Sequence, residues 1–112
     1  MKPEAQLQKD VIDLAHAFKW RVAHFRPVRV QRADGSVYYQ TPVAADGAGF
    51  PDLVLARGGA GGDVLFVELK SDTGQVEAKQ REWLDTLRDG GATVYVWKPK
   101  HWKSGEIENA LR

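Results

Sequence analysis

The sequence predicts an α/β or α+β fold in which one mixed β-sheet is covered by helices. An apolar helical stripe near the N-terminus is followed by several short β-prone segments, a second helical stripe and a last strand. The chain has 112 residues, a length that suits one folded domain. Neither an internal repeat nor a linker-like segment divides it, so we expect a single domain over residues 1–112.

The composition is that of an ordinary soluble globular protein. Apolar residues make up 43% of the chain and charged residues 28%. The absence of cysteine excludes a disulfide framework and a thiolate zinc site, and it suits a reducing compartment. The sequence has neither an apolar run of transmembrane length nor the apolar core of a signal peptide. We therefore expect a cytoplasmic protein that does not bind a membrane.

The net charge is only +1, but the charges are unevenly distributed. Residues 14–33 contain five basic and no acidic residues, whereas residues 63–89 contain seven acidic and four basic ones. A second basic stretch is formed by Lys98, Lys100 and Lys103. Basic flanks around an acidic centre suit a protein that grips phosphates and holds a metal between them. Solvated surface charge on an unrelated domain explains this single feature equally well.

The first helix is predicted over residues 3–18. Pro3 is a favourable first helical residue, and Glu4 falls on the same helical stripe as the apolar side chains that follow. An unpaired charge on an inward stripe is costly, so Glu4 needs a functional reason. The apolar residues of the stripe are Leu7, Val11, Leu14, Ala15 and Phe18.

Five strands are predicted next, of which the second and third form a hairpin, at residues 21–25, 28–32, 37–40, 52–57 and 64–71. The Asp-Gly step between the second and third segments is a strong hairpin signal. Small and turn-forming residues before the fourth segment indicate a mobile loop. The glycine run between the last two segments lacks the Lys-Ser/Thr of a phosphate loop and leads into a strand, so we read it as a plain turn.

A second helix, a sixth strand and a short last helix complete the predicted fold. The second helix ends at Gly90 and Gly91, and its apolar stripe includes Gln80. Residues 92–97 read as a buried strand, and Ser104 as the cap of the last helix. The apolar positions of the second helical stripe are Val76, Trp83, Leu84 and Leu87.

Two carboxylates and one ammonium group are predicted to meet at an edge of the sheet. Asp52 follows Pro51 at the mouth of one strand, while Glu68 and Lys70 share one face of the next. Carboxylate oxygens are the ligands that Mg²⁺ prefers, and a cation there can polarise a phosphodiester. The pattern therefore predicts metal-dependent phosphodiester cleavage. An aspartate in a turn and a solvent-facing Glu-Lys pair on an edge strand, without any catalytic role, would produce the same sequence pattern. Glu4 and Gln80, two polar residues in apolar stripes, favour the site.

Taken together, the motifs resemble the VRR-NUC family, a branch of the PD-(D/E)xK nucleases. The resemblance implies a restriction-endonuclease-like core with a mixed central sheet, flanking helices and an inserted β-hairpin. Stand-alone members come largely from phages and bacteria, and they are similar to Holliday junction resolvases in fold and dimeric organisation. The motifs are Glu4, Gly49-Phe50-Pro51-Asp52-Leu53, Glu68-Leu69-Lys70 and Gln80-Arg81-Glu82-Trp83-Leu84.

The resemblance also implies roles for individual residues. Asp52 and Glu68 would ligate Mg²⁺ or Mn²⁺, with the backbone carbonyl of Leu69 as a third protein ligand. Lys70 would position the attacking water or stabilise the charge of the transition state. Glu4 would act through a metal-bound water or a second metal. Gln80 would orient Lys70 or a phosphate.

We therefore expect a metal-dependent, structure-selective endonuclease that hydrolyses branched DNA, of the Holliday junction resolvase type, in a bacterial or phage-infected cell. Symmetric cleavage of a four-way junction needs two active sites, which a homodimer supplies most simply. Three alternatives stay open: a less selective or flap-preferring endonuclease, a non-catalytic DNA-binding module, and an interaction domain without a nucleic-acid role.

Overall fold

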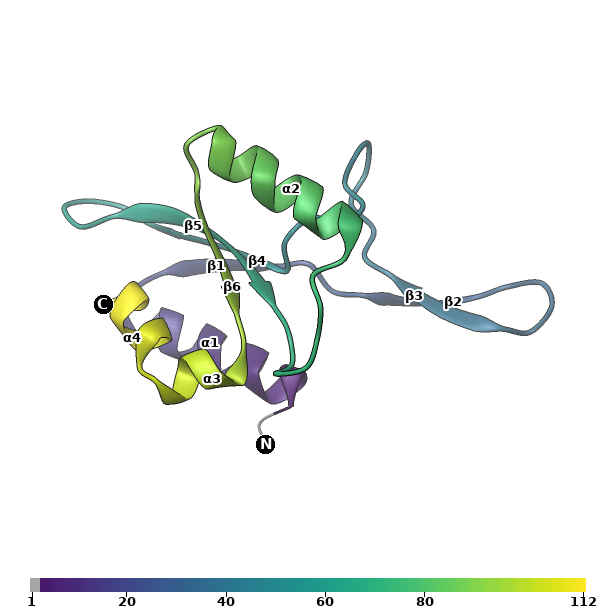
Figure 1. Cartoon of the computed structure of the whole chain (residues 1–112), viewed down its shortest axis with the longest axis horizontal. Coiled ribbons are helices and arrows are strands. Elements are labelled where there is room, and N and C mark those ends of the chain that lie inside the picture. The colour runs from purple at the N-terminus through teal and green to yellow at the C-terminus, as the bar shows by residue number, and fades with distance from the viewer. Residues whose placement is uncertain (1–2) are drawn as a thin grey trace.

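The computed structural model describes residues 3–112 and contains a four-stranded sheet between helices and a separate two-stranded sheet (Figure 1). Helices α1, α3 and α4 cover one face of the larger sheet, and α2 covers the other. The elements in chain order are α1 (Glu4–Ala17), β1 (Arg21–His24), β2 (Val28–Gln31), β3 (Val37–Gln40), β4 (Leu53–Arg57), β5 (Asp63–Leu69), α2 (Ala78–Asp89), β6 (Thr93–Trp97), α3 (Pro99–Lys103) and α4 (Glu106–Leu111).

The larger sheet is mixed, as predicted, with the strand order β1-β4-β5-β6. Strands β1, β4 and β5 are antiparallel neighbours, whereas β6 pairs with β5 in parallel after the crossover through α2. The smaller sheet is the predicted hairpin, in which β2 and β3 are antiparallel. Among the described helices, none is long and apolar enough to cross a membrane.

The core lies between the sheet and the layer of α1, α3 and α4. Alternate side chains of β4 and β5 point into this layer, because successive strand residues face opposite sides of a sheet. Each such side chain removes apolar surface from water and contributes about 1.5–3 kcal/mol to folding. The fully buried residues of this layer include Leu7, Val11, Leu53, Leu55, Val67, Ile107 and Leu111.

Arg57 ties the ends of α1 and α4 to β4. Its guanidinium group donates hydrogen bonds of 3.0 Å to the carbonyl oxygens of Phe18 and Leu111, and it stacks 4.3 Å from the ring centre of Trp20. The Trp20 indole N–H also donates to the Leu111 carbonyl, at 2.9 Å. These bonds satisfy carbonyl groups at helix ends that have no partner within their own helix.

The opposite face of the sheet is held to α2 by an aromatic cluster. The Phe50 ring meets the rings of Phe25, Phe66 and Trp83 edge to face, at centre distances of 5.3, 6.1 and 4.9 Å. The Trp83 indole N–H donates to the Asp46 carbonyl oxygen at 2.9 Å. The segment between β3 and β4 is therefore fixed against α2 although it forms neither helix nor strand.

Three details of the prediction are corrected. The strand predicted at residues 92–97 is β6, which begins at Thr93, but only Trp97 in it is buried, because β6 is an edge strand with one neighbour. Helix α3 was not predicted; its signal is Pro99 at the first helical position. The cap residue of α4 is Gly105, with φ +86°, although the Ser104 hydroxyl oxygen still accepts a hydrogen bond from the Glu106 N–H at 3.3 Å.

Candidate active site

The strand register places the predicted catalytic residues at one end of the sheet. Leu53 is the cross-strand partner of Val67, so the residue before Leu53 lies beside the residue after Val67. Those residues are Asp52 and Glu68. The proximity of the two carboxylates therefore follows from antiparallel pairing of two apolar strands.

The Asp52 carboxylate is held by the backbone of the neighbouring strand. The Leu69 N–H donates a hydrogen bond of 2.9 Å to Asp52 Oδ2. The Asp52 carbonyl oxygen accepts a 3.0 Å hydrogen bond from the Phe25 N–H, which fixes the residue on its other side. Pro51 is buried directly before it. The half-buried Asp52 side chain consequently has a defined direction toward the end of β5.

Glu68 is the one buried charged residue of the described chain, with 1% of its surface exposed. Its Oε2 atom accepts a 2.8 Å hydrogen bond from Gln80 Nε2 and lies 3.7 Å from Lys70 Nζ. Its Oε1 atom is buried and accepts no hydrogen bond from any described residue. A buried carboxylate oxygen without a partner is costly, so this atom is available for a ligand.

Gln80 contacts Glu68 at 2.8 Å, a contact that the sequence did not predict, and its predicted role toward Lys70 or a phosphate stays a prediction. Gln80 lies in the first turn of α2, where its Oε1 atom accepts a 2.9 Å hydrogen bond from the Glu77 N–H. That bond assigns the amide oxygen to the helix end and leaves Nε2 directed at Glu68. The polar residue in the apolar stripe is explained by this double contact.

Glu4 is exposed, so the prediction that it continues the inward stripe of α1 is wrong. Pro3 is the N-cap residue, and Glu4 therefore occupies the first turn, before the buried part of the helix begins at Leu7. The residue still lies near the site. Partial burial and the charge of Asp52 both raise the pKa of Glu4, while Lys70 lowers it.

Burial raises the pKa of both Asp52 and Glu68, and the negative charge of Asp52 adds to the effect at Glu68. Burial, followed by the negative charge of Asp52, raises the pKa of Glu68 from 4.5 to about 8, and Lys70 only partly offsets this. Burial also raises the pKa of Asp52, against the opposing effects of the Leu69 N–H and Lys70. A bound cation would relieve both effects, because it neutralises charge that water does not reach.

The residues present fit a divalent metal ion with oxygen ligands. The partnerless Glu68 Oε1 atom and the Asp52 carboxylate supply hard oxygen donors. The N–H and C=O groups of a strand residue point to the same side, so the Leu69 carbonyl lies on the Asp52 side, as its N–H does. No three His, Cys, Asp or Glu side chains of residues 3–112 form a metal-binding group, and this ligand set therefore depends on the carbonyl, water and substrate oxygens.

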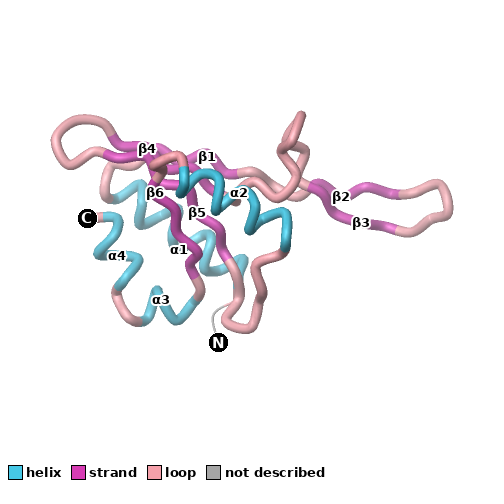
Figure 2. The backbone as a smooth tube through the Cα atoms, turned by 45° about the horizontal axis from the view of Figure 1, so that its top comes forward, coloured by secondary structure: helices cyan, strands magenta, loops and turns pink. Residues whose placement is uncertain are grey.

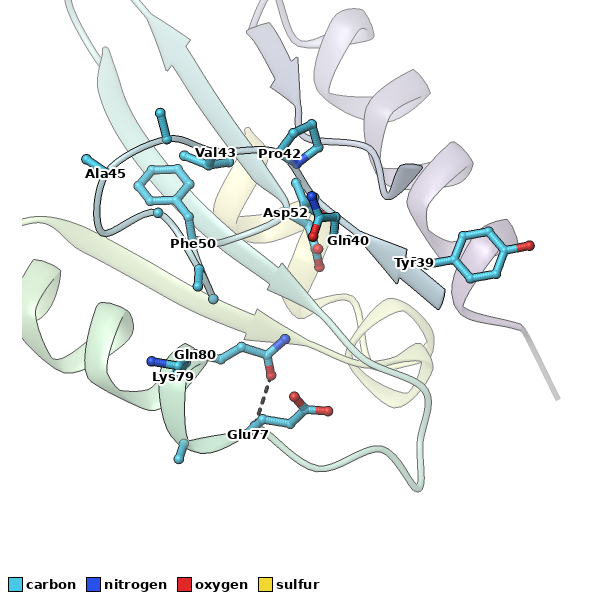
Figure 3. A pocket seen from close by; sticks show the side chains of 16 residues that line it. Tyr39, Gln40, Pro42, Val43, Ala45, Phe50, Asp52, Glu77, Lys79 and Gln80 are labelled. Atoms are coloured by element: carbon cyan, nitrogen blue, oxygen red, sulfur yellow. Dashed lines mark hydrogen bonds between the residues drawn. The ribbon is translucent and has the colours of Figure 1, made fainter. Parts of the chain in front are cut away.

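A cavity of about 820 Å³ opens in front of Asp52 (Figure 3). Its walls are the end of the hairpin, the segment between β3 and β4, and the first turn of α2. Tyr39, Gln40 and Lys79 line it together with Asp52 and Gln80, and the sequence prediction assigned the first three no place in the site. Tyr39 and Gln40 are the last residues of the predicted strand 37–40, and Lys79 precedes the motif residue Gln80, which is their only signal in the sequence.

Gly49 allows the segment between β3 and β4 to approach α2 closely. Gly49 is part of the Gly49-Phe50-Pro51-Asp52-Leu53 motif, but the sequence alone provides no reason for a glycine there. Its φ is +85°, and a Cβ atom there would lie 2.6 Å from the Lys79 carbonyl carbon and 2.8 Å from the Gln80 nitrogen. Only glycine allows both this conformation and this approach. The first turn of α2, and with it the Gln80 side chain, is positioned by this contact.

A mixed sheet that brings a buried and a half-buried carboxylate together with a lysine, beside a cavity lined by Asp52 and Gln80, defines a hydrolase-type site. The family model of the VRR-NUC domain matches residues 38–100, more than half of the chain. The chain therefore belongs to the VRR-NUC family, whose fold its mixed sheet and helices match. This membership indicates a nuclease that acts on DNA, in a family that generally uses divalent metals. The match includes Asp52, Glu68, Lys70 and Gln80 but not Glu4. No curated protein and no solved structure matches the chain.

The raised pKa of Glu68 predicts a pH-dependent stability of the metal-free protein. Between pH 4.5 and about 8 the unfolded chain releases this proton before the folded protein does, so stability falls as the pH rises through this window. The limiting slope for one proton is about 1.4 kcal/mol per pH unit. Urea denaturation in EDTA at pH 5, 6.5 and 8 measures it, with Glu68→Gln expected to flatten the curve. Wild-type stability that stays constant or rises over this window would contradict the account.

Gly49→Ala is expected to destabilise the protein by about 1–3 kcal/mol, because the left-handed backbone and the contact with α2 both disfavour a side chain. The matched control is Gly35→Ala in the hairpin turn, where φ is +91° but nothing lies within 4 Å of the added Cβ atom. Urea denaturation of both variants separates backbone strain from crowding. Equal losses of unfolding free energy would show that the contact with α2 does not matter.

Proposed function

We propose that the protein is an endonuclease that hydrolyses phosphodiester bonds in branched DNA with Mg²⁺ or Mn²⁺ bound by Asp52 and Glu68. The observation that carries this proposal is the buried Glu68 Oε1 atom next to Asp52, which accepts no hydrogen bond from any described residue. The other oxygen of the same carboxylate, Oε2, lies 3.7 Å from Lys70 Nζ. A buried carboxylate oxygen without a partner lowers the stability of the fold, and a bound cation would offset this loss.

The metal ligands would be Asp52, Glu68 and the Leu69 carbonyl, with Glu4 at the rim acting through water. A divalent ion held there supplies a Lewis acid for the phosphodiester and lowers the pKa of a water molecule. The chain's own contribution is the orientation of the ligands. The Leu69 N–H holds Asp52, and Gln80 Nε2 holds Glu68, so neither carboxylate has to reorganise during the reaction.

Lys70 is the proposed catalytic cation of the chain. Its ammonium group is largely buried and lies 3.7 Å from Glu68 Oε2, at the end of the same strand face. A positive charge in this position would align the attacking water and stabilise the negative charge that develops on the phosphate oxygens. The pairing with Glu68 keeps the ammonium group in place before the substrate binds.

Selectivity for branched DNA and a homodimeric assembly are the finer parts of the proposal. They are supported by the resemblance of stand-alone VRR-NUC proteins to Holliday junction resolvases and by the need for two active sites in symmetric cleavage. We further propose that residues 1–112 form one nuclease domain and that the protein works in the cytoplasm.

Cleavage of a labelled four-way junction, a flap and a linear duplex of the same sequence tests the function. We expect cleavage of the junction with Mg²⁺ or Mn²⁺, none in EDTA, and a rate at least about 10²-fold lower for Asp52→Asn and for Lys70→Met, since each removes a charge at the reacting centre. Asp85→Asn and Lys9→Met, which change exposed residues in the same way, are expected to cut as the wild type does.

The outcomes separate the parts of the proposal. Equal cleavage of the linear duplex would overturn the branched-DNA preference and leave a less selective endonuclease. Activity in EDTA would show that cleavage does not need a metal ion. Unchanged rates in both site variants would show that Asp52 and Lys70 are not catalytic. Salt-sensitive binding without any product would identify a DNA-binding module. A monomer in sedimentation at the concentrations of the assay would contradict the homodimer.

A further inference from the structure

The β2–β3 hairpin projects from the nuclease core as a separate ribbon (Figures 1 and 2). Its two strands pair only with each other, and none of their residues belongs to the buried core. An isolated two-stranded ribbon is at best marginally stable in water, so it adds little to the stability of the fold. Because the ribbon contributes little to the core, we expect it to contact a binding partner.

Both faces of the ribbon meet solvent, and each carries a tyrosine. Arg29 pairs across the strands with Tyr39, while Val30 pairs with Tyr38 on the opposite face. The Tyr39 side chain is 67% exposed, and Val28 is 46% exposed. A strand pair in a folded core has at least one buried face, and this pair has none.

Basic residues outnumber acidic ones in the hairpin, where Arg29 and Arg32 stand against Asp34, and Arg26 lies just before β2. Arg26 and Arg29 form no ion pair within residues 3–112, and Arg32 stacks 4.1 Å from the ring centre of Tyr38. The one carboxylate of the hairpin, that of Asp34, is occupied in the turn, where it accepts hydrogen bonds of 2.9 and 2.6 Å from the Ser36 N–H and hydroxyl. The hairpin therefore presents arginine beside tyrosine, and its one acidic residue lies in the turn and not on the strands.

This charge selects DNA over a second copy of the chain as the partner. Two β2–β3 hairpins packed together would bring four arginines into one surface with only the two turn aspartates to compensate them. Like charges at an interface cost several kcal/mol. DNA phosphates supply the missing negative charge, and the major groove is wide enough to admit a two-stranded ribbon.

The base of the hairpin also adjoins the proposed active site. Tyr39 and Gln40, the last two residues of β3, line the same cavity as Asp52 (Figure 3). A DNA backbone that follows the ribbon toward the core therefore reaches this cavity directly. Binding by the ribbon and cleavage at Asp52 can act on one continuous strand.

We propose that the β2–β3 hairpin is a DNA-binding arm that grips the duplex next to the cleaved bond, with Arg29 and Arg32 on its phosphates. The inference rests on the proposed nuclease function for its substrate, but it concerns binding and not the chemical step. Loss of the arm should therefore weaken DNA binding and raise KM while it leaves kcat at saturating DNA unchanged.

The test is Arg29→Gln/Arg32→Gln, measured by fluorescence anisotropy with a labelled four-way junction in EDTA over a range of salt concentrations. Removing two phosphate contacts is expected to weaken binding about 10- to 100-fold and to make the slope of log K against log salt less negative by about 2. Arg29→Lys/Arg32→Lys keeps the charges and is expected to keep most of the slope. Circular dichroism confirms that each variant retains the core fold.

The matched control is Lys9→Gln/Arg88→Gln, which changes the net charge equally at exposed positions on α1 and α2 and is expected to bind as the wild type does. Unchanged affinity and slope in the hairpin variant would overturn the inference. A lost self-association in sedimentation with an unchanged DNA slope would also overturn it and assign the ribbon to a second copy. Asp52→Asn should show the reverse profile, lost cleavage with intact binding, so a failed nuclease assay leaves the binding result readable.

Discussion

The site depends on one physical constraint, a glutamate buried beside an aspartate at the end of two paired strands. Glu68 is almost fully buried, and one of its oxygens has no partner among the described residues. Water cannot screen the repulsion between two carboxylates in such a place, and the pKa of Glu68 rises to about 8. The surrounding contacts all act on this pair: Gln80 orients Glu68, the Leu69 N–H holds Asp52, and Lys70 offsets part of the charge.

The two faces of the sheet have different tasks as a result. The face under α1, α3 and α4 is apolar throughout and is closed by the hydrogen bonds of Arg57 to helix ends, so it supplies stability. The face under α2 carries Glu68 and ends in an open cavity. Burying a carboxylate that is only partly compensated lowers the stability of the fold, and the well-packed opposite layer offsets this loss. Helix α2 contributes to both stability and the site. The contact between Phe50 and Trp83 holds it against the sheet, and its first turn places Gln80 within hydrogen-bond distance of Glu68.

Much of the fold could be predicted because its signals are local. Helical spacing in α1, the Asp-Gly turn of the hairpin and the apolar runs of β4 and β5 each fix an element by short-range patterns, and all are confirmed. The errors occur where contacts between distant segments determine the burial or the direction of a side chain. The edge position of β6 leaves it half-buried, and the start of α1 leaves Glu4 exposed. The contact between Gln80 and Glu68 was not predicted, and the predicted role of Gln80 toward Lys70 or a phosphate stays a prediction. Sequence spacing brought Asp52 and Glu68 together, but the loop contact at Gly49 and the cavity depend on distant segments, and the catalytic roles themselves stay predictions.

Calorimetric titration of Mn²⁺ into the protein, repeated in two buffers of different ionisation enthalpy, tests the central claim most directly. If Asp52 and Glu68 hold the ion, binding must displace the proton that the raised pKa leaves on the pair, so more protons are released at pH 7 than at pH 9. Glu68→Gln should abolish both the binding and the proton release, while Glu82→Gln on the exposed side of α2 should change neither. Binding that is equally strong in Glu68→Gln, or that releases no protons at pH 7, would contradict the account.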